Sequence, residues 1–112
     1  MTDTAVLNQD PVLSEIVKRL VADFNPSRVF LFGSRARGDA GEGSDYDLLV
    51  VLPTMNAPSH RLAQKAHRHS LKGIPAPVDV IMVSESYFEE NKAVIGTLPE
   101  LAIYEGKELY AA

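Results

Sequence analysis

The sequence predicts a small mixed α/β (α+β) domain in which three or four strands form one sheet flanked by helices. Short apolar runs rich in β-branched and aromatic residues indicate the strands, and longer segments with apolar residues at helical spacing indicate the helices. Gly, Pro and Asn separate these segments. A length of 112 residues is near the commonest domain size, so residues 1–112 are expected to form a single domain.

The first half of the chain is expected to contain one helix and two strands. Asp10 followed by Pro11 is typical of an N-cap and a first helical residue, and helical spacing of apolar residues continues to about Phe24. An Asn-Pro-Ser sequence then breaks the helix, and residues 28–32 form a short apolar strand. The second strand, 45–52, is continuously apolar in its second half, as expected for an interior strand that is covered on both faces.

The second half is expected to contain three helices, one strand and a final edge segment. Ser59 is expected to cap the first helix and Ser84 to begin the second. The expected helices cover 59–71, 84–95 and a short stretch around 98–102 that stops at Gly106, the strand covers 78–83, and the edge segment covers 107–110. The order of elements is therefore helix, strand, strand, helix, strand, helix, helix.

Composition excludes several classes of function. The net charge of -4 is poorly suited to holding a phosphate backbone, so no direct nucleic-acid binding is expected. The absence of cysteine excludes disulfides, thiolate metal sites and cysteine nucleophiles. No apolar run approaches the ~20 residues that span a bilayer, and the first ten residues lack the basic cluster of a secretory signal. We therefore expect no membrane partner and a cytoplasmic location.

Two pairs of residues beside the predicted strands carry candidate chemistry. Gly33 allows the backbone to approach a phosphate closely, and Ser34 offers a hydroxyl and an amide N–H, which would face an anion if a helical turn begins there. Asp45 and Asp47 alternate along the second strand, so both carboxylates are expected on one face. Because neighbouring carboxylates repel, a hard cation between them is favoured, and oxygen ligands suit Mg²⁺ or Mn²⁺ better than zinc.

Asp79 is a lone acid within the apolar third strand. A carboxylate in such surroundings is costly unless it is paired or coordinated. If the third strand lies beside the second, Asp79 completes an acidic triad that can hold two metal ions about 4 Å apart, and it can assist deprotonation of an incoming hydroxyl. The structural alternatives are an ordinary strand-edge ion pair for Asp79 and a solvated strand start for Asp45 and Asp47.

The run 33–48, Gly-Ser-Arg-Ala-Arg-Gly-Asp-Ala-Gly-Glu-Gly-Ser-Asp-Tyr-Asp-Leu, closely resembles the signature of the DNA polymerase β-like nucleotidyltransferase superfamily. The short chain and the Gly-Ser-Arg-Ala-Arg-Gly form are similar to the minimal nucleotidyltransferases (MNT), the antitoxin halves of HEPN/MNT toxin–antitoxin pairs. The resemblance covers about 29–83 and implies the polymerase β-like nucleotidyltransferase fold. It also implies transfer of a nucleotidyl group from a nucleoside triphosphate, usually ATP, to an acceptor hydroxyl, with Mg²⁺ or Mn²⁺ as the metal.

The resemblance assigns expected roles to the residues of this run. The expected catalytic and metal-binding acids are Asp45, Asp47 and Asp79. The candidates for nucleotide binding are Gly33 and Ser34, which would hold the β- and γ-phosphates, together with Arg35, Arg37 and Ser44. The two arginines could instead contact a partner or belong to a solvated loop.

The function that the resemblance implies is a protein adenylyltransferase that moves AMP from ATP to a hydroxyl. Because 112 residues leave little room for a separate acceptor domain, we expect a partner, a HEPN-type toxin, to supply the acceptor. In some minimal members this acceptor is a tyrosine. Two alternatives stay open: a non-catalytic antitoxin that neutralises its partner by occlusion, and a small-molecule nucleotidyltransferase of the antibiotic-modifying type.

Three histidines between residues 60 and 69 invite a metal hypothesis. No carboxylate lies at a helical spacing that would complete a zinc site with His60, His67 and His69. We expect a polar helix face, which could form part of a partner surface.

Overall fold

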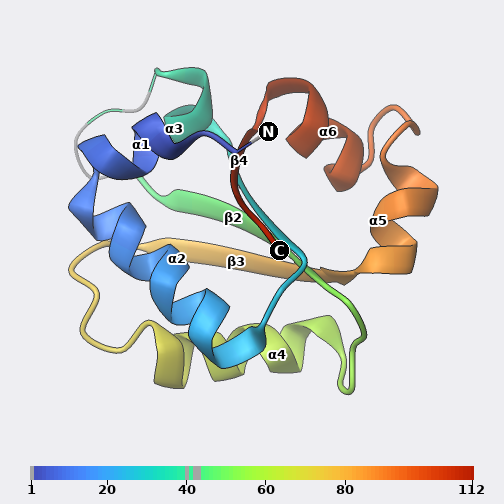
Figure 1. Ribbon diagram of the computed structural model, residues 1–112, viewed down its shortest axis with the longest axis horizontal. Helices are drawn as coiled ribbons and strands as arrows, with labels where there is room; N and C mark the ends of the chain where they lie inside the picture. The colour runs from blue at the N-terminus through green and yellow to red at the C-terminus, as the bar shows by residue number, and fades with distance from the viewer. Residues whose placement is uncertain (1, 40, 42–43) are drawn as a thin grey trace.

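Four strands form one mixed sheet with helices against both faces (Figure 1). The structure is a computed structural model that describes residues 2–39, 41 and 44–112. The strands are β1 (Arg28–Phe32), β2 (Tyr46–Leu52), β3 (Val78–Ser84) and β4 (Lys107–Ala111), in the spatial order β3-β2-β1-β4. β1 pairs antiparallel with both β2 and β4, whereas β2 and β3 are parallel. The mixed sheet predicted from the sequence is confirmed.

The helices lie in two groups on opposite faces of the sheet (Figure 1). The described helices are α1 (Thr4–Gln9), α2 (Pro11–Phe24), α3 (Ser34–Arg37), α4 (Ser59–Lys65), the π-helix η1 (Ala66–Ser70), α5 (Glu85–Asn91) and α6 (Leu98–Glu105). The apolar side of α2 and the buried residues of α4 and η1 pack on one face of the sheet, and α5 and α6 cover the other with Phe88 and Ala102. Residues along β2 alternate between these two cores, which explains why the strand is continuously apolar.

The start of α2 forms as its sequence predicts. Asp10 is the N-cap and accepts a hydrogen bond from the backbone N–H of Leu13 at 3.0 Å, and Pro11 is the first helical residue. Proline fits there because its missing N–H would have no intrahelical partner. The helix ends at Phe24 and is capped by Asn25, which adopts a left-handed conformation with φ of 48°.

Other boundaries differ from the prediction. Pro58, not Ser59, is the N-cap of α4, and the Ser59 hydroxyl donates to the carbonyl of Met82 instead. The helix expected to reach Leu71 changes after Lys65 into a π-helix, in which the N–H of Leu71 bonds to the carbonyl of Ala66. Ser84 does cap α5, but that helix ends at Asn91 rather than near residue 95.

Two short helices, α1 and α3, add to the predicted elements. α1 lies against α2 and is capped by Asp3, whose carboxylate accepts from the N–H of Val6. No helix in the described part of the chain combines the length and the apolar character needed to cross a bilayer.

Candidate active site

Three carboxylates meet where β2 and β3 begin. The two strands run parallel in a register that places Asp47 directly beside Asp79. Asp45 immediately precedes β2, so it lies outside the strand in which the sequence analysis placed it. Asp47 is half-buried, whereas Asp45 and Asp79 are exposed. The condition on which the predicted acidic triad depended, that the third strand lies beside the second, is therefore met.

Gly33 brings the end of β1 against these carboxylates. The residue before it, Phe32, pairs with Asp47 across β1 and β2. Gly33 has φ of 75° and ψ of -159°, a conformation that is essentially restricted to glycine. A Cβ built on Gly33 would overlap the carboxylate of Asp47. Glycine is therefore required here both for its backbone conformation and for the close approach.

The short helix α3 follows this contact directly. Gly33 is its N-cap, and the carbonyl of Gly33 accepts from the N–H groups of Ala36 and Arg37 at 3.1 Å. The N–H groups of the first turn of a helix have no partner within it, and they carry partial positive charge. Ser34, half-buried at this turn, thus lies beside the carboxylates with a hydroxyl and an amide donor.

Arg35 is held against Tyr46, the residue between the two aspartates. Its guanidinium carbon lies 3.9 Å from the centre of the Tyr46 ring, and its Nε donates to the carbonyl of Ser44 at 2.9 Å. The Tyr46 hydroxyl in turn donates to the Asp10 carboxylate at 2.7 Å. Burial raises the pKa of Tyr46, and the hydrogen bond to Asp10 adds to this. These contacts fix the backbone just before Asp45.

Sequence reasoning missed this chain of contacts. Asp10 was recognised only as a helix cap, although its second carboxylate oxygen binds Tyr46. The available signal was the strand alternation, which points Tyr46 away from the carboxylates and toward the face that α2 covers. Ser44 contributes its carbonyl to Arg35, and its side chain forms no hydrogen bond with another described residue.

Arg37 is exposed at the far end of α3. It forms ion pairs with Asp39 at 3.3 Å and with Glu105 of α6 at 3.4 Å. Residues 40, 42 and 43 of the loop that follows belong to the signature run but lie outside the described residues.

The electrostatics of the carboxylates favour a bound cation. Burial raises the pKa of the Asp47 carboxyl above its usual value, and the nearby charges of Asp79 and Asp45 raise it further, while Arg37 opposes the shift. The three side chains therefore lie within electrostatic range of one another. A cation would relieve this repulsion.

Among the described residues, no group of three or more His, Cys, Asp or Glu side chains is placed to hold a metal ion, so the three carboxylates do not form a ready-made three-ligand site. Mg²⁺ commonly takes one or two carboxylates and completes its coordination with water and substrate phosphates. The oxygen-only donor set of Asp45, Asp47 and Asp79 fits that requirement. The three histidines, by contrast, are all exposed on α4 and η1.

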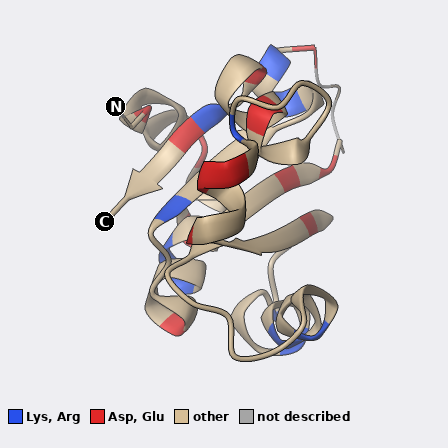
Figure 2. Cartoon of the chain, turned by 90° about the vertical axis from the view of Figure 1, so that its right-hand side faces the viewer, with Lys and Arg blue, Asp and Glu red and all other residues tan. Residues whose placement is uncertain are grey.

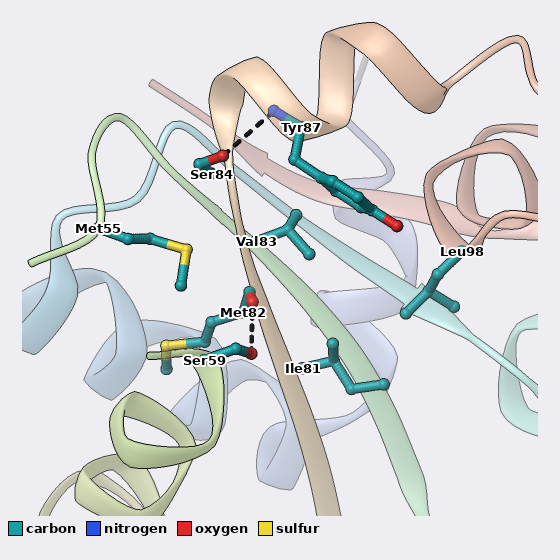
Figure 3. A pocket seen from close by; sticks show the side chains of 8 residues that line it. All are labelled: Met55, Ser59, Ile81, Met82, Val83, Ser84, Tyr87 and Leu98. Atoms are coloured by element: carbon teal, nitrogen blue, oxygen red, sulfur yellow. Dashed lines mark hydrogen bonds between the residues drawn. The ribbon is translucent and has the colours of Figure 1, made fainter. Parts of the chain in front are cut away.

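A hollow lies along the second half of β3 (Figure 3). It has a volume of about 370 Å³ and is mostly apolar, with Met55, Ile81, Val83, Tyr87 and Leu98 among its lining residues. Its lining residue nearest to Asp79 in β3 is Ile81, two residues further along the strand and on the same face. None of the three carboxylates is among the residues that line the hollow.

Comparison with known proteins identifies a family and a relative that are similar in sequence to this chain. The sequence profile of the nucleotidyltransferase domain family matches residues 13–105. A protein of Methanocaldococcus jannaschii, provisionally described as a protein adenylyltransferase, is 39% identical over 67 residues, which cover 52% of this chain and 67% of that protein.

Solved structures show the same fold. A crystal structure from Sulfolobus solfataricus, provisionally described as a nucleotidyltransferase, aligns with a TM-score of 0.55 and 28% identity over 71% of this chain and 70% of that one. A toxin–antitoxin crystal structure with AMP-PNP aligns with a TM-score of 0.54 over 88% of this chain and 73% of that one. At 24% identity, this second similarity is evidence for the fold alone.

Proposed function

The chain belongs to the nucleotidyltransferase domain family, and from that premise we propose that it transfers AMP from ATP to a hydroxyl group of a partner protein. The observation that carries the proposal is the convergence of Gly33, Asp47 and Asp79, which joins the end of β1 to the carboxylates of β2 and β3. The provisional description of the Methanocaldococcus jannaschii relative as a protein adenylyltransferase supports a protein as acceptor.

The proposed nucleotide site lies between α3 and the carboxylates. Gly33 and Ser34 would hold the β- and γ-phosphates, because the first turn of α3 offers donors and partial positive charge. A divalent cation bound by Asp45, Asp47 and Asp79 would neutralise charge on the triphosphate and the leaving pyrophosphate. Arg37, with its guanidinium exposed, is a further candidate to contact the triphosphate.

The proposed reaction is a displacement at the α-phosphorus. The acceptor oxygen forms a bond to that phosphorus, the bond to the bridging oxygen breaks, and pyrophosphate leaves. Asp79 is exposed at the beginning of β3, so an acceptor can reach it, and its carboxylate would take the hydroxyl proton. Arg35 would act differently from the role predicted for it, because it holds the backbone before Asp45 rather than facing the triphosphate.

The proposed biological role is that of an antitoxin whose partner, a HEPN-type toxin, is the acceptor. Two toxin–antitoxin crystal structures contain a chain of similar fold, at 24% and 22% identity, and this similarity motivates the proposed role. The resemblance of the run 33–48 to the minimal nucleotidyltransferases supports it independently.

The test is incubation of the purified chain with ATP labelled in the α-phosphate, Mg²⁺ and the protein encoded by the adjacent gene. We expect label on that protein, and we expect none when Asp47→Asn replaces the wild type. Absence of label from ATP and from every other nucleoside triphosphate would contradict the proposal.

A further inference from the structure

A basic stripe runs along α4 and η1. Residues 59–72 contain four Lys or Arg residues and no acidic residue, although the chain as a whole has a net charge of -4. Arg61, Lys65 and Arg68, which we call the basic stripe, follow helical spacing and are all exposed. The other side of the same segment, with Leu62 and Ala66, is buried. Figure 2 shows Lys and Arg without Asp or Glu on this helix at the bottom of the molecule.

The basic stripe differs from most of the other cations in its lack of carboxylate partners. Elsewhere, cations pair with acids of their own surroundings: Arg19 with Glu15, Arg28 with Glu108, Arg37 with Asp39 and Glu105, Lys92 with Glu89, and Lys107 with Asp3. Among the described residues, no carboxylate forms an ion pair with Arg61, Lys65 or Arg68. Like charges at this spacing repel by a few tenths of a kcal/mol, roughly, per pair. Lys65 also lies over the ring of Phe24, with its Nζ 5.6 Å from the ring centre. This contact accounts for Lys65 in part, but no contact between described residues of the isolated domain offsets the repulsion along the stripe as a whole.

The stripe begins beside the apolar hollow along the second half of β3. Ser59, the first residue of α4, lines the hollow and donates its hydroxyl to the carbonyl of Met82 (Figure 3). Figure 3 also shows Tyr87 and Leu98 on the far side of the same hollow. Tyr87 is 44% exposed. A charged surface and an apolar hollow thus adjoin at the first turn of α4.

We propose that the basic stripe docks an acidic segment of a partner protein and that the hollow receives an apolar side chain of the same segment. Charge complementarity selects an acidic partner, and the hollow provides the apolar burial that anchors protein interfaces. A nucleic acid fits less well, because the hollow beside the stripe is mostly apolar and residues 59–72 contain no Phe, Tyr or Trp on which a base could stack. This inference does not depend on catalysis.

The test uses fluorescent peptides of about 20 residues and measures their binding by anisotropy at about 0.15 M ionic strength, where the Debye length is about 8 Å. One peptide is all glutamate, and a second contains two leucines near one end. We expect wild type to bind both, with the leucine peptide several-fold tighter. The variant R61E/K65E/R68E should lose at least about tenfold in affinity for both peptides, which corresponds to about 1.4 kcal/mol.

A matched control carries the same change in net charge at other places. Lys18, Lys92 and Lys107 lie outside residues 59–72, so K18E/K92E/K107E should bind both peptides within about twofold of the wild-type affinity, since exposed charges more than about 8 Å from the peptide are largely screened at this ionic strength. The neutral variant R61Q/K65Q/R68Q should give an intermediate loss. Circular dichroism establishes that each variant is folded.

Several results would overturn the inference. A single-stranded RNA of about 20 nucleotides that binds more tightly than both peptides would assign the stripe to nucleic acid. If the stripe variant and its matched control lose equal affinity for the peptides, the effect is one of net charge and not of the stripe. If the wild type binds the two peptides with equal affinity, the proposed role of the hollow is refuted. Because ATP binding to the stripe variant should stay at the wild-type level, a failure here is distinguishable from a failure of the nucleotide site.

Discussion

Gly33 lies so close to Asp47 that a single added Cβ would overlap the Asp47 carboxylate. The contact joins two segments that are 14 residues apart in the chain, and it places the turn into α3 against the acids of β2 and β3. It also links the backbone conformation of one residue to the proposed chemistry of another. The most direct tests of the site therefore begin at this pair.

Replacing Gly33 with alanine is expected to damage both the fold and the nucleotide site. The new Cβ overlaps Asp47 and must also adopt φ of 75°, so we expect a loss of about 2–4 kcal/mol in the free energy of unfolding and loss of ATP binding. Urea denaturation and ATP titration measure the two effects.

The control is Gly73→Ala. Gly73 has φ of 83°, but a Cβ there meets no atom within 4 Å. It should cost only about 1 kcal/mol and leave ATP binding intact. Equal effects of the two substitutions would show that the approach to Asp47 is unimportant.

Asp47→Asn is expected to stabilise the metal-free protein at neutral pH. The folded-state pKa of Asp47 is raised by burial and by Asp79 and Asp45, so its charged form is disfavoured in the folded protein. Below the pKa that it has in the unfolded protein, such a carboxyl contributes fully to the free energy of unfolding. This contribution is lost as the pH rises through the pKa that it has in the folded protein. The variant should therefore have a larger free energy of unfolding than the wild type at pH 7. This difference should vanish as the pH falls toward the ordinary pKa of an aspartate.

Thermal unfolding between about pH 3 and pH 8, a range that includes both the ordinary aspartate pKa of about 3.9 and neutral pH, measures this effect. Mg²⁺ with ATP should raise the melting temperature of the wild type and not that of Asp47→Asn. A variant that is less stable than the wild type at pH 7 would contradict the electrostatic account.

We expect Arg35 to stabilise the fold by holding the backbone just before Asp45 in place. Arg35→Ala removes the contact with the Tyr46 ring and the hydrogen bond to the Ser44 carbonyl, so it should lower the free energy of unfolding by about 1–2 kcal/mol. Tyr46→Phe keeps the ring and loses only the hydrogen bond to Asp10, and should cost less. If Arg35→Ala weakens ATP binding without changing stability, the arginine contacts the triphosphate as the sequence predicted.

A double substitution separates catalysis from occlusion. Asp45→Asn/Asp47→Asn removes two proposed metal ligands, and neither change reaches the basic stripe on α4 and η1. We expect this variant to bind its partner but to fail to neutralise a toxin when both are expressed at native levels. Full neutralisation by the variant would establish occlusion as the mechanism.

The sequence predicts those features that depend on local chemistry. Asp10 and Pro11 begin α2 because a side-chain acceptor and a residue without an N–H suit a helix start. The alternation of β2 between two apolar cores is likewise visible in its continuous apolar run. Asp47 and Asp79 were predicted to converge on the condition that their strands are neighbours, and the strand order meets it.

Features that depend on tertiary contacts were missed. Ser59 is a good cap by itself, but the carbonyl of Met82 takes its hydroxyl, and the cap position falls to Pro58. The change from α-helix to π-helix after Lys65 has no sequence signal that local propensity could supply. The contact of Arg35 with Tyr46 joins α3 to the start of β2, and spacing along the chain cannot reveal such a tertiary contact.

The central claim is that the carboxylates at the start of β2 and β3 support transfer of a nucleotidyl group, and one comparison tests it most directly. The chain is incubated with Mg²⁺ and the protein encoded by the adjacent gene, in parallel with ATP labelled at the α-phosphate and ATP labelled at the γ-phosphate. Nucleotidyl transfer predicts that the partner protein acquires the α label and not the γ label, and that Asp47→Asn abolishes this labelling. Transfer of the γ label, or α labelling that survives in Asp47→Asn, would contradict the account.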